Sequence, residues 1–257
     1  MPKPRVIILR APGTNCDIET AYAFERAGAE PQRVHINRLI EQKQLANDAQ
    51  ILCLPGGFSY GDDIAAGRIL ASRLRHHVAD VLHDFKNRGK LVLGICNGFQ
   101  VLVQTGLLFQ EQGAGPIATL TNNDSGKFED RWVHLSVEAN RCVLLQGIER
   151  LYLPIAHAEG KFVAKSNAAA TELEQAGQLV LRYVTDRSRP AEVYPDNPNG
   201  SERNVAGVCD ETGHVLGLMP HPERFVHRTH HPRWTREELS DVGDGMAIFA
   251  NAVRCFS

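Results

Sequence analysis

The strongest constraint on the fold is the alternation of short apolar runs with helical patterns over residues 1–110. Apolar runs at residues 5–10, 51–54 and 90–95 each lead into a glycine-containing turn, and a helical pattern follows each turn. This alternation is typical of a parallel sheet covered by helices on both faces, with functional groups at the carboxyl ends of the strands. We therefore expect an α/β fold with a mostly parallel central sheet flanked by helices.

One of the expected helices is long. From Leu70 to Phe85 apolar residues recur at spacings of three and four, and the pattern ends at Gly89. Such spacing forms one apolar stripe of a helix, and glycine commonly ends helices. The expected helices span residues 17–27, 64–88, 99–108 and 244–254.

The pattern changes beyond residue 115. Polar and apolar residues alternate around residues 132–137, while residues 179–184 and 215–219 are short apolar runs bounded by turn-forming residues. Both patterns indicate strands. We expect extra, partly antiparallel strands added to the same sheet, a turn-rich loop at residues 195–204, and one domain spanning residues 1–257.

Composition excludes several classes of function. A net charge of −2, with both signs spread along the chain, provides no basic surface for nucleic acid or for an anionic membrane. No run of about 18 apolar residues suggests a membrane span, and no signal peptide is apparent. The six cysteines are scattered without a Cys-x-x-Cys pair, so neither a zinc site nor a redox dithiol is expected. We expect a cytoplasmic protein with reduced thiols.

A candidate nucleophile follows the apolar run at residues 90–95. Cys96 lies between Gly94 and Gly98, where a strand is expected to turn sharply into a helix. This Gly-x-nucleophile-x-Gly pattern forms an elbow in which neighbouring backbone passes too close for a Cβ atom at the flanking positions. A helix N-terminus also favours the reactive thiolate. The alternative is that Cys96 is a small core residue, and Cys16, in the loop after the first strand, is a competing nucleophile without an elbow.

A candidate base follows another expected strand. Residues 215–219 lead into Pro220, His221, Pro222 and Glu223. Prolines favour extended backbone, so His221 and Glu223 are expected to point the same way. A carboxylate beside an imidazole orients it and stabilises its charged form. The alternative is a rigid surface turn.

The other histidines allow further readings. His157 is a second candidate base or part of a substrate or interface loop, and an ordinary strand end is the simpler reading. His227, His230 and His231 suggest a metal, but no carboxylate or cysteine stands at matching spacing. We therefore expect no metal and a solvated basic loop there.

A glycine loop supplies candidate oxyanion donors. Gly56 and Gly57 follow the strand at residues 51–54, so their N–H groups are expected at the same sheet edge as Cys96. The N–H of Asn97 is a second donor, because it opens the helix after the nucleophile. The loop lacks the Walker lysine and the dinucleotide-binding glycine pattern, so phosphate binding is not expected.

Taken together, these segments resemble the class I, or triad-type, glutamine amidotransferases. Within that family the chain is most similar to the glutaminase subunits of phosphoribosylformylglycinamidine synthase, an enzyme of purine synthesis. Such proteins have a flavodoxin-like fold. The resemblance rests on residues 11–17, 55–62, 94–100, 156–160, 197–201 and 217–224.

The resemblance implies a mechanism. Cys96 would attack the side-chain amide of glutamine, with His221 and Glu223 completing the triad and Gln100 shaping the glutamine pocket. The N–H groups of Gly57 and Asn97 would hold the oxyanion. No cofactor is implied in this chain. ATP and magnesium would be bound by a separate synthetase subunit that receives the ammonia, with or without a small accessory subunit.

Other readings stay open. A glutaminase serving anthranilate or GMP synthesis and a γ-glutamyl hydrolase would have the same fold, and an inactive regulatory relative would keep the fold without activity. The stretch at residues 227–245 is longer than in many stand-alone glutaminase subunits and leaves the type of partner open.

Overall fold

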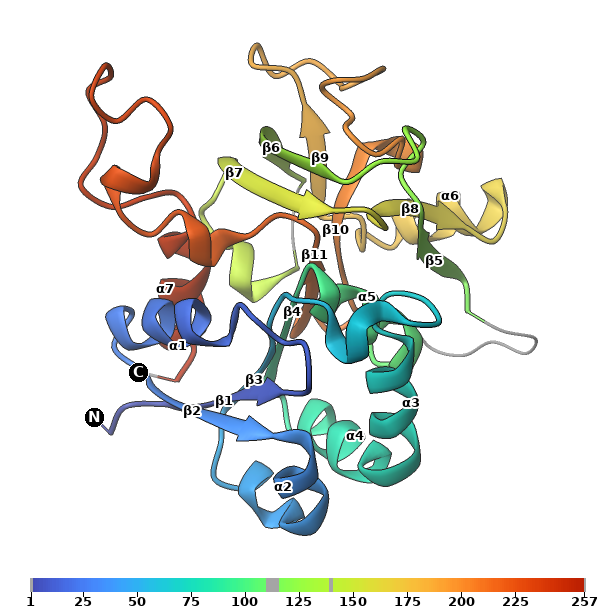
Figure 1. The fold of residues 1–257 in the computed structure, drawn as a ribbon, viewed down its shortest axis with the longest axis vertical. Coiled ribbons are helices and arrows are strands. Elements are labelled where there is room, and N and C mark those ends of the chain that lie inside the picture. The colour runs from blue at the N-terminus through green and yellow to red at the C-terminus, as the bar shows by residue number, and fades with distance from the viewer. Residues whose placement is uncertain (1, 110–115, 139–140, 257) are drawn as a thin grey trace.

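A nine-stranded mixed sheet forms the centre of the protein (Figure 1). The computed structural model describes residues 2–109, 116–138 and 141–256. The strands follow the order β2-β1-β3-β4-β11-β10-β9-β6-β7. Pairing is parallel from β2 to β11 and antiparallel from β11 to β7. The strands are β1 (Arg5–Arg10), β2 (Glu30–His35), β3 (Ile51–Leu54), β4 (Leu91–Ile95), β6 (Glu129–Val137), β7 (Arg150–His157), β9 (Leu181–Val184), β10 (Val205–Cys209) and β11 (Val215–Leu218).

This sheet confirms the predicted fold class. The parallel part comes from the strand and helix alternation of the N-terminal half, and the antiparallel strands lie in the C-terminal half. The sequence did not reveal β7 or β10. It also missed a separate two-stranded antiparallel sheet formed by β5 (Ala118–Thr121) and β8 (Lys161–Ala164).

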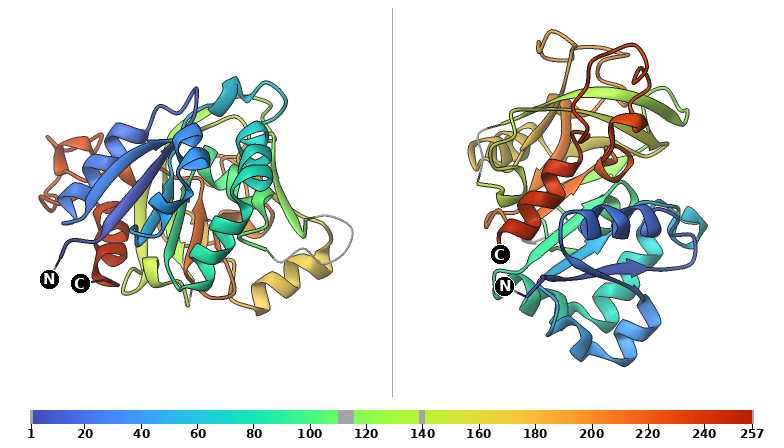
Figure 2. Two further views of the ribbon diagram at one scale, coloured as in Figure 1. Left: turned by 90° about the horizontal axis from the view of Figure 1, so that it is seen from below. Right: turned by 90° about the vertical axis from the view of Figure 1, so that its left-hand side faces the viewer.

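Helices cover both faces of the parallel strands (Figures 1 and 2). Helices α1 and α7 lie together on one side, and α3, α4 and α5 lie on the other. None of the helices in the described part of the chain has the length and apolar character that crossing a bilayer requires. The helices are α1 (Asp17–Arg26), α2 (Ile36–Glu41), α3 (Arg68–His77), α4 (Ala79–Asn87), α5 (Asn97–Thr105), α6 (Asn167–Gln175) and α7 (Met246–Arg254).

The prediction of one long helix over residues 64–88 was wrong. Two helices, α3 and α4, meet at Val78, whose φ of −138° is not helical. A β-branched residue adopts extended φ values readily. Val78 is fully buried, and the bend at this position lets each helix bury its own apolar residues, such as Leu74 in α3 and Phe85 in α4. The apolar period continues across the bend, which is why the sequence pattern did not reveal it.

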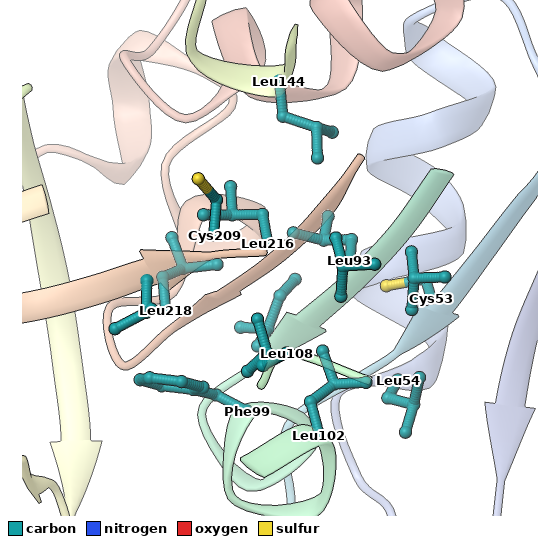
Figure 3. Close-up of a cluster of buried hydrophobic side chains, with 14 of the residues drawn as sticks. Cys53, Leu54, Leu93, Phe99, Leu102, Leu108, Leu144, Cys209, Leu216 and Leu218 are labelled. Atoms are coloured by element: carbon teal, nitrogen blue, oxygen red, sulfur yellow. The ribbon is translucent and has the colours of Figure 1, made fainter. Parts of the chain in front are cut away.

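The central strands are buried on both faces. Every residue of β3, β4 and β11 is buried, as expected of parallel strands covered by two helix layers. Phe99 and Leu102 of α5 lie on one side of these strands, whereas Cys53, Leu93 and Leu144 lie on the other (Figure 3). This packing holds α5 directly against the strand that precedes it.

Helix α5 also approaches β3 very closely. A Cβ atom placed on Gly98 would lie 1.8 Å from the carbonyl oxygen of Leu54, far inside van der Waals contact. Backbone rather than a flexible side chain occupies that space, so only a shift of α5 or β3 would relieve the clash. The glycine is therefore required by packing.

We predict that Gly98→Ala lowers the free energy of unfolding by about 3 kcal/mol or more, because overpacking forces the backbone to move. Gly89→Ala is the control. Gly89 has a φ of +69°, and an added Cβ there would meet no described atom within 4 Å. The control substitution should therefore lower the free energy of unfolding by only about 1 kcal/mol, because alanine is disfavoured in left-handed backbone. Urea unfolding measures both. Equal losses in the two variants would contradict the close approach of α5 to β3.

Candidate active site

Cys96 lies at the junction between β4 and α5. Its backbone has φ +51° and ψ −107°, values that a residue with a side chain rarely adopts. The surroundings impose this conformation. The Cys96 N–H donates to the carbonyl oxygen of Leu218 at 2.8 Å, and a Cβ on Gly94 would lie 2.7 Å from the Gly98 oxygen. The sequence-predicted elbow is therefore present, with the thiol in a buried position 3.6 Å from the oxygen of Ala156.

His221 and Glu223 form a tight buried pair. The Nδ1 atom of His221 lies 2.6 Å from Oε1 of Glu223, and both side chains are buried. The carboxylate oxygen accepts, so Nδ1 carries a proton. The His221 backbone N–H also donates to the Pro154 oxygen at 2.8 Å. The imidazole is therefore fixed both by the contact at its Nδ1 atom and by the hydrogen bond of the His221 backbone.

The charge balance around His221 favours the imidazolium. Burial is the largest effect and opposes the charged form, but the negative charge of the Glu223 carboxylate, aided by the Cys96 and Cys16 sulfurs, outweighs it, so the pKa of His221 lies well above its usual value. The Nε2 atom is buried and has no hydrogen-bond partner in the described part of the protein. The structure thus brings together the predicted Cys96, His221 and Glu223, and leaves the second ring nitrogen unoccupied.

The glycine loop after β3 lies against this pair. A Cβ on Gly56 would lie 2.8 Å from Cε1 of His221, and Gly57 has φ +144° with backbone of Asn15 2.8 Å from its Cβ position. Neither the Gly57 N–H nor the Asn97 N–H donates a hydrogen bond to any of the described residues. Two backbone donors are therefore available at the loop and at the start of α5.

Two predicted pocket residues brace the walls of the site. The Asn97 side chain accepts from the Ser59 N–H at 3.2 Å and donates to Gln100 Oε1 at 3.0 Å. The Gln100 side chain in turn donates to the backbone oxygen of Glu159. This chain of bonds ties the glycine loop and the segment after β7 to α5. Both the amide oxygen and the amide nitrogen of Gln100 are therefore engaged in hydrogen bonds within the protein.

Comparisons with known proteins agree on one family. Residues 3–256 match the CobB/CobQ-like glutamine amidotransferase domain. The chain is 48% identical over 255 residues to the phosphoribosylformylglycinamidine synthase subunit PurQ of Dehalococcoides mccartyi, covering 99% of this chain and 98% of that protein. It is 40% identical over 267 residues to the PurQ of Methanococcus maripaludis, covering 99% and 98%. The chain belongs to the PurQ family of glutamine amidotransferases.

Solved structures agree with this assignment. The PurLQS structure from Thermotoga maritima aligns with a TM-score of 0.76 and 34% identity, covering 100% of both chains. Another glutamine amidotransferase from Thermotoga maritima aligns with a TM-score of 0.53 at 16% identity, covering 91% of this chain and 81% of that one, which shows a shared fold alone.

His157 lies buried at the end of β7, which agrees with the simpler reading of an ordinary strand end, and its assignment to a substrate or interface loop stays a prediction. It is the last residue of β7, and its ring is buried against Gly160, where a Cβ would lie 2.2 Å from the ring. Its Nδ1 atom pairs with Asn123 Oδ1 at 3.1 Å. Burial, followed by the nearby His221, lowers the pKa of His157 to about 3. His157 therefore remains neutral and is a poor proton acceptor.

One of the three histidines after residue 226 differs from expectation, whereas His230 is exposed as predicted. His231 does not lie in a solvated basic loop. It is buried and packs against Trp132, Tyr152 and Phe225. Aromatic burial, which no local pattern signalled, fixes the start of the 227–245 segment against β6 and β7.

Sequence reasoning missed the position of Cys16 relative to His221. Its sulfur, a ring nitrogen of His221 and a carboxylate oxygen of Glu223 all lie within 4.8 Å of one another. Burial is the main reason that the pKa of Cys16 rises to about 11, so this thiol stays protonated at neutral pH. The only available signal was that Cys16 follows a strand ending at the same sheet edge.

The buried, neutral His157 predicts a specific acid sensitivity. Its folded pKa of about 3 lies below the usual 6.5, so its contribution to stability is complete above pH 6.5 and is lost as the pH falls toward 3. His157→Gln removes this effect. Between pH 7 and pH 5 the variant should lose about 2 kcal/mol less unfolding free energy than the wild type. Urea unfolding at both pH values measures the difference, and parallel losses would mean that His157 titrates normally.

Proposed function

We propose that this chain is the glutaminase subunit of a phosphoribosylformylglycinamidine synthase and hydrolyses glutamine to glutamate and ammonia for purine synthesis. The single observation that carries the proposal is the buried His221–Glu223 pair beside Cys96, with the Nε2 atom of His221 free of any partner among the described residues. Full-length similarity to PurQ subunits supports the choice of pathway.

The first half of the reaction forms a thioester. His221 takes the Cys96 proton on Nε2, and the thiolate attacks the side-chain amide carbon of glutamine. The amide oxygen becomes an oxyanion, which accepts hydrogen bonds from the N–H groups of Gly57 and Asn97. The imidazolium then gives its proton to the nitrogen as the carbon–nitrogen bond breaks, and ammonia leaves. The Glu223 carboxylate stabilises the imidazolium throughout.

The second half releases glutamate. Neutral His221 takes a proton from a water molecule, which attacks the thioester carbon, and the same two N–H groups hold the second oxyanion. The carbon–sulfur bond breaks and the sulfur regains a proton from the imidazolium. Glutamate is released and the enzyme is restored, and no metal or cofactor in this chain is required by these steps.

The ammonia needs a second active site. We infer a separate synthetase subunit that binds ATP and magnesium and uses the ammonia to convert formylglycinamide ribonucleotide to formylglycinamidine ribonucleotide. The match to the solved PurLQS structure from Thermotoga maritima supports a multi-subunit assembly, with or without a small accessory subunit. We place this assembly in the cytoplasm.

The division of labour predicts separable activities. Cys96→Ser in the reconstituted complex should reduce glutamine-dependent synthesis by at least about a thousandfold, because the hydroxyl is not activated as the thiol is. Synthesis from added ammonium salt should stay within twofold of wild type. Cys255→Ser, which changes an exposed cysteine in the last turn of the chain, is the matched control. Equal loss of both activities would refute the proposed division.

An electrophilic glutamine analogue tests the nucleophile directly. We expect labelling of Cys96, blocked by excess glutamine, and no labelling of the protonated thiol of Cys16. Peptide mass spectrometry after incubation of the complex locates the adduct. Labelling of Cys16 instead, or of neither cysteine, would contradict the assignment of Cys96.

A further inference from the structure

Arg224 follows Glu223 directly in the chain and yet bonds to other partners. Its Nε donates to Glu19 Oε1 at 3.0 Å, and its Nη2 donates to the Cys16 sulfur at 3.2 Å. The Oε2 atom of Glu223 is buried without a hydrogen-bond partner in the described residues. An arginine near a bare carboxylate oxygen would ordinarily pair with it. The guanidinium is instead bonded to Glu19 and Cys16, although Glu223 is near enough to raise the Arg224 pKa.

The Cys16 thiol is held firmly where it meets the guanidinium. The Cys16 N–H donates to the Gly56 oxygen at 3.2 Å, and its carbonyl oxygen accepts from the Thr20 hydroxyl at 2.6 Å. The thiol donates to Asn15 Oδ1 at 3.2 Å, which leaves the sulfur lone pairs for Arg224. These bonds fix the Cys16 backbone and place the thiol between Asn15 and Arg224.

The same sulfur adjoins the His221–Glu223 pair. It lies within 4.8 Å of both partners, and the absent side chain of Gly56 makes room for it, since a Cβ there would be 3.0 Å from the sulfur. Burial raises the pKa of the Cys16 thiol to about 11, so it is uncharged at neutral pH. A neutral thiol accepts from Arg224 without adding a second negative charge.

We propose that Cys16 is a positioning residue that holds the Arg224 guanidinium away from the Glu223 carboxylate and so reserves that carboxylate for His221. This inference rests on the proposed role of His221 and Glu223. If Arg224 bonded to the free Oε2, the carboxylate charge would be largely compensated, and the imidazolium of His221 would lose stabilisation. The Cys96 thiolate, which depends on that imidazolium, would become scarcer.

Several other groups face this pair and stay unchanged in the experiment. His157 and Cys96 face His221, Cys53 faces Glu223, and Glu19 faces Arg224. None of them is altered by a substitution at position 16, which removes the contacts of Cys16 with Arg224 and with His221. A double variant that also changes Arg224 separates these two contacts.

The test is the pH dependence of Cys96 alkylation by iodoacetamide in the full chain, followed by peptide mass spectrometry. In Cys16→Ala we expect the rate at pH 7 to fall at least fivefold and the pH of half-maximal alkylation to rise by about one unit. Cys16→Ser keeps an acceptor for Arg224 and should stay within a few-fold of wild type. In the double variant that combines Cys16→Ala with Arg224→Gln, the pH profile should return toward that of wild type, because position 224 then carries no positive charge to pair with Glu223.

Two results would overturn the inference. One is an unchanged pH profile in Cys16→Ala. The other is a shifted profile that the added Arg224→Gln leaves unrestored, which would mean loss of packing rather than intrusion of charge. Far-UV circular dichroism and thermal melting check that each variant is folded. Because alkylation requires no glutamine, failure here is distinct from failure of the proposed function, which would appear as absence of glutamine hydrolysis by wild type.

Discussion

The structure depends on a contact between backbones, where α5 begins against the end of β3. A Cβ on Gly98 would overlap the carbonyl of Leu54, and two residues earlier in the chain Cys96 adopts a positive φ of +51°. A strained residue persists only when its surroundings fix it. Here the bond from Cys96 N–H to Leu218 adds β11 to the same arrangement. The elbow thus sets where the thiol, the free N–H of Asn97 and the strand leading to His221 stand relative to one another.

The second determinant is a buried ion pair whose partners are both held in place. Burying His221 and Glu223 costs desolvation free energy that a loose pair would not recover. The 2.6 Å contact and the electrostatic effect of the carboxylate offset that cost, which is why the pKa of His221 rises in spite of burial. His157 is near enough to His221 to be affected by its charge, but among the described residues its ring pairs with Asn123 and with no carboxylate, and its pKa falls instead. Two buried histidines therefore have opposite charge states because of their neighbours.

The sequence predicted features that local chemistry determines. The glycines around Cys96 restrict the backbone there, so the elbow could be read directly. His221 and Glu223 do pair as predicted, but residues Pro222–Arg224 form a 3-10 turn and not the extended backbone that the prolines led us to expect. The break at Val78, the burial of His231 among aromatic rings and the contact of Cys16 with Arg224 depend on packing between segments far apart in the chain. Periodicity and spacing carry no information about such contacts. The same reason explains why the short strands β5 and β8 were missed.

Strand β11 lies beside β4, although the two are separated by most of the C-terminal half of the chain. During translation the nucleophile is therefore made long before its base. At ribosomal rates of about 5–20 residues per second, the interval is on the order of ten seconds. Over that time the N-terminal parallel strands lack the neighbour that carries His221, and the edge of β4 is open to pairing with other chains. Pairing of β11 with β4 closes that edge in the folded protein and leads directly to His221, so a fragment that ends before β11 lacks the base of the site.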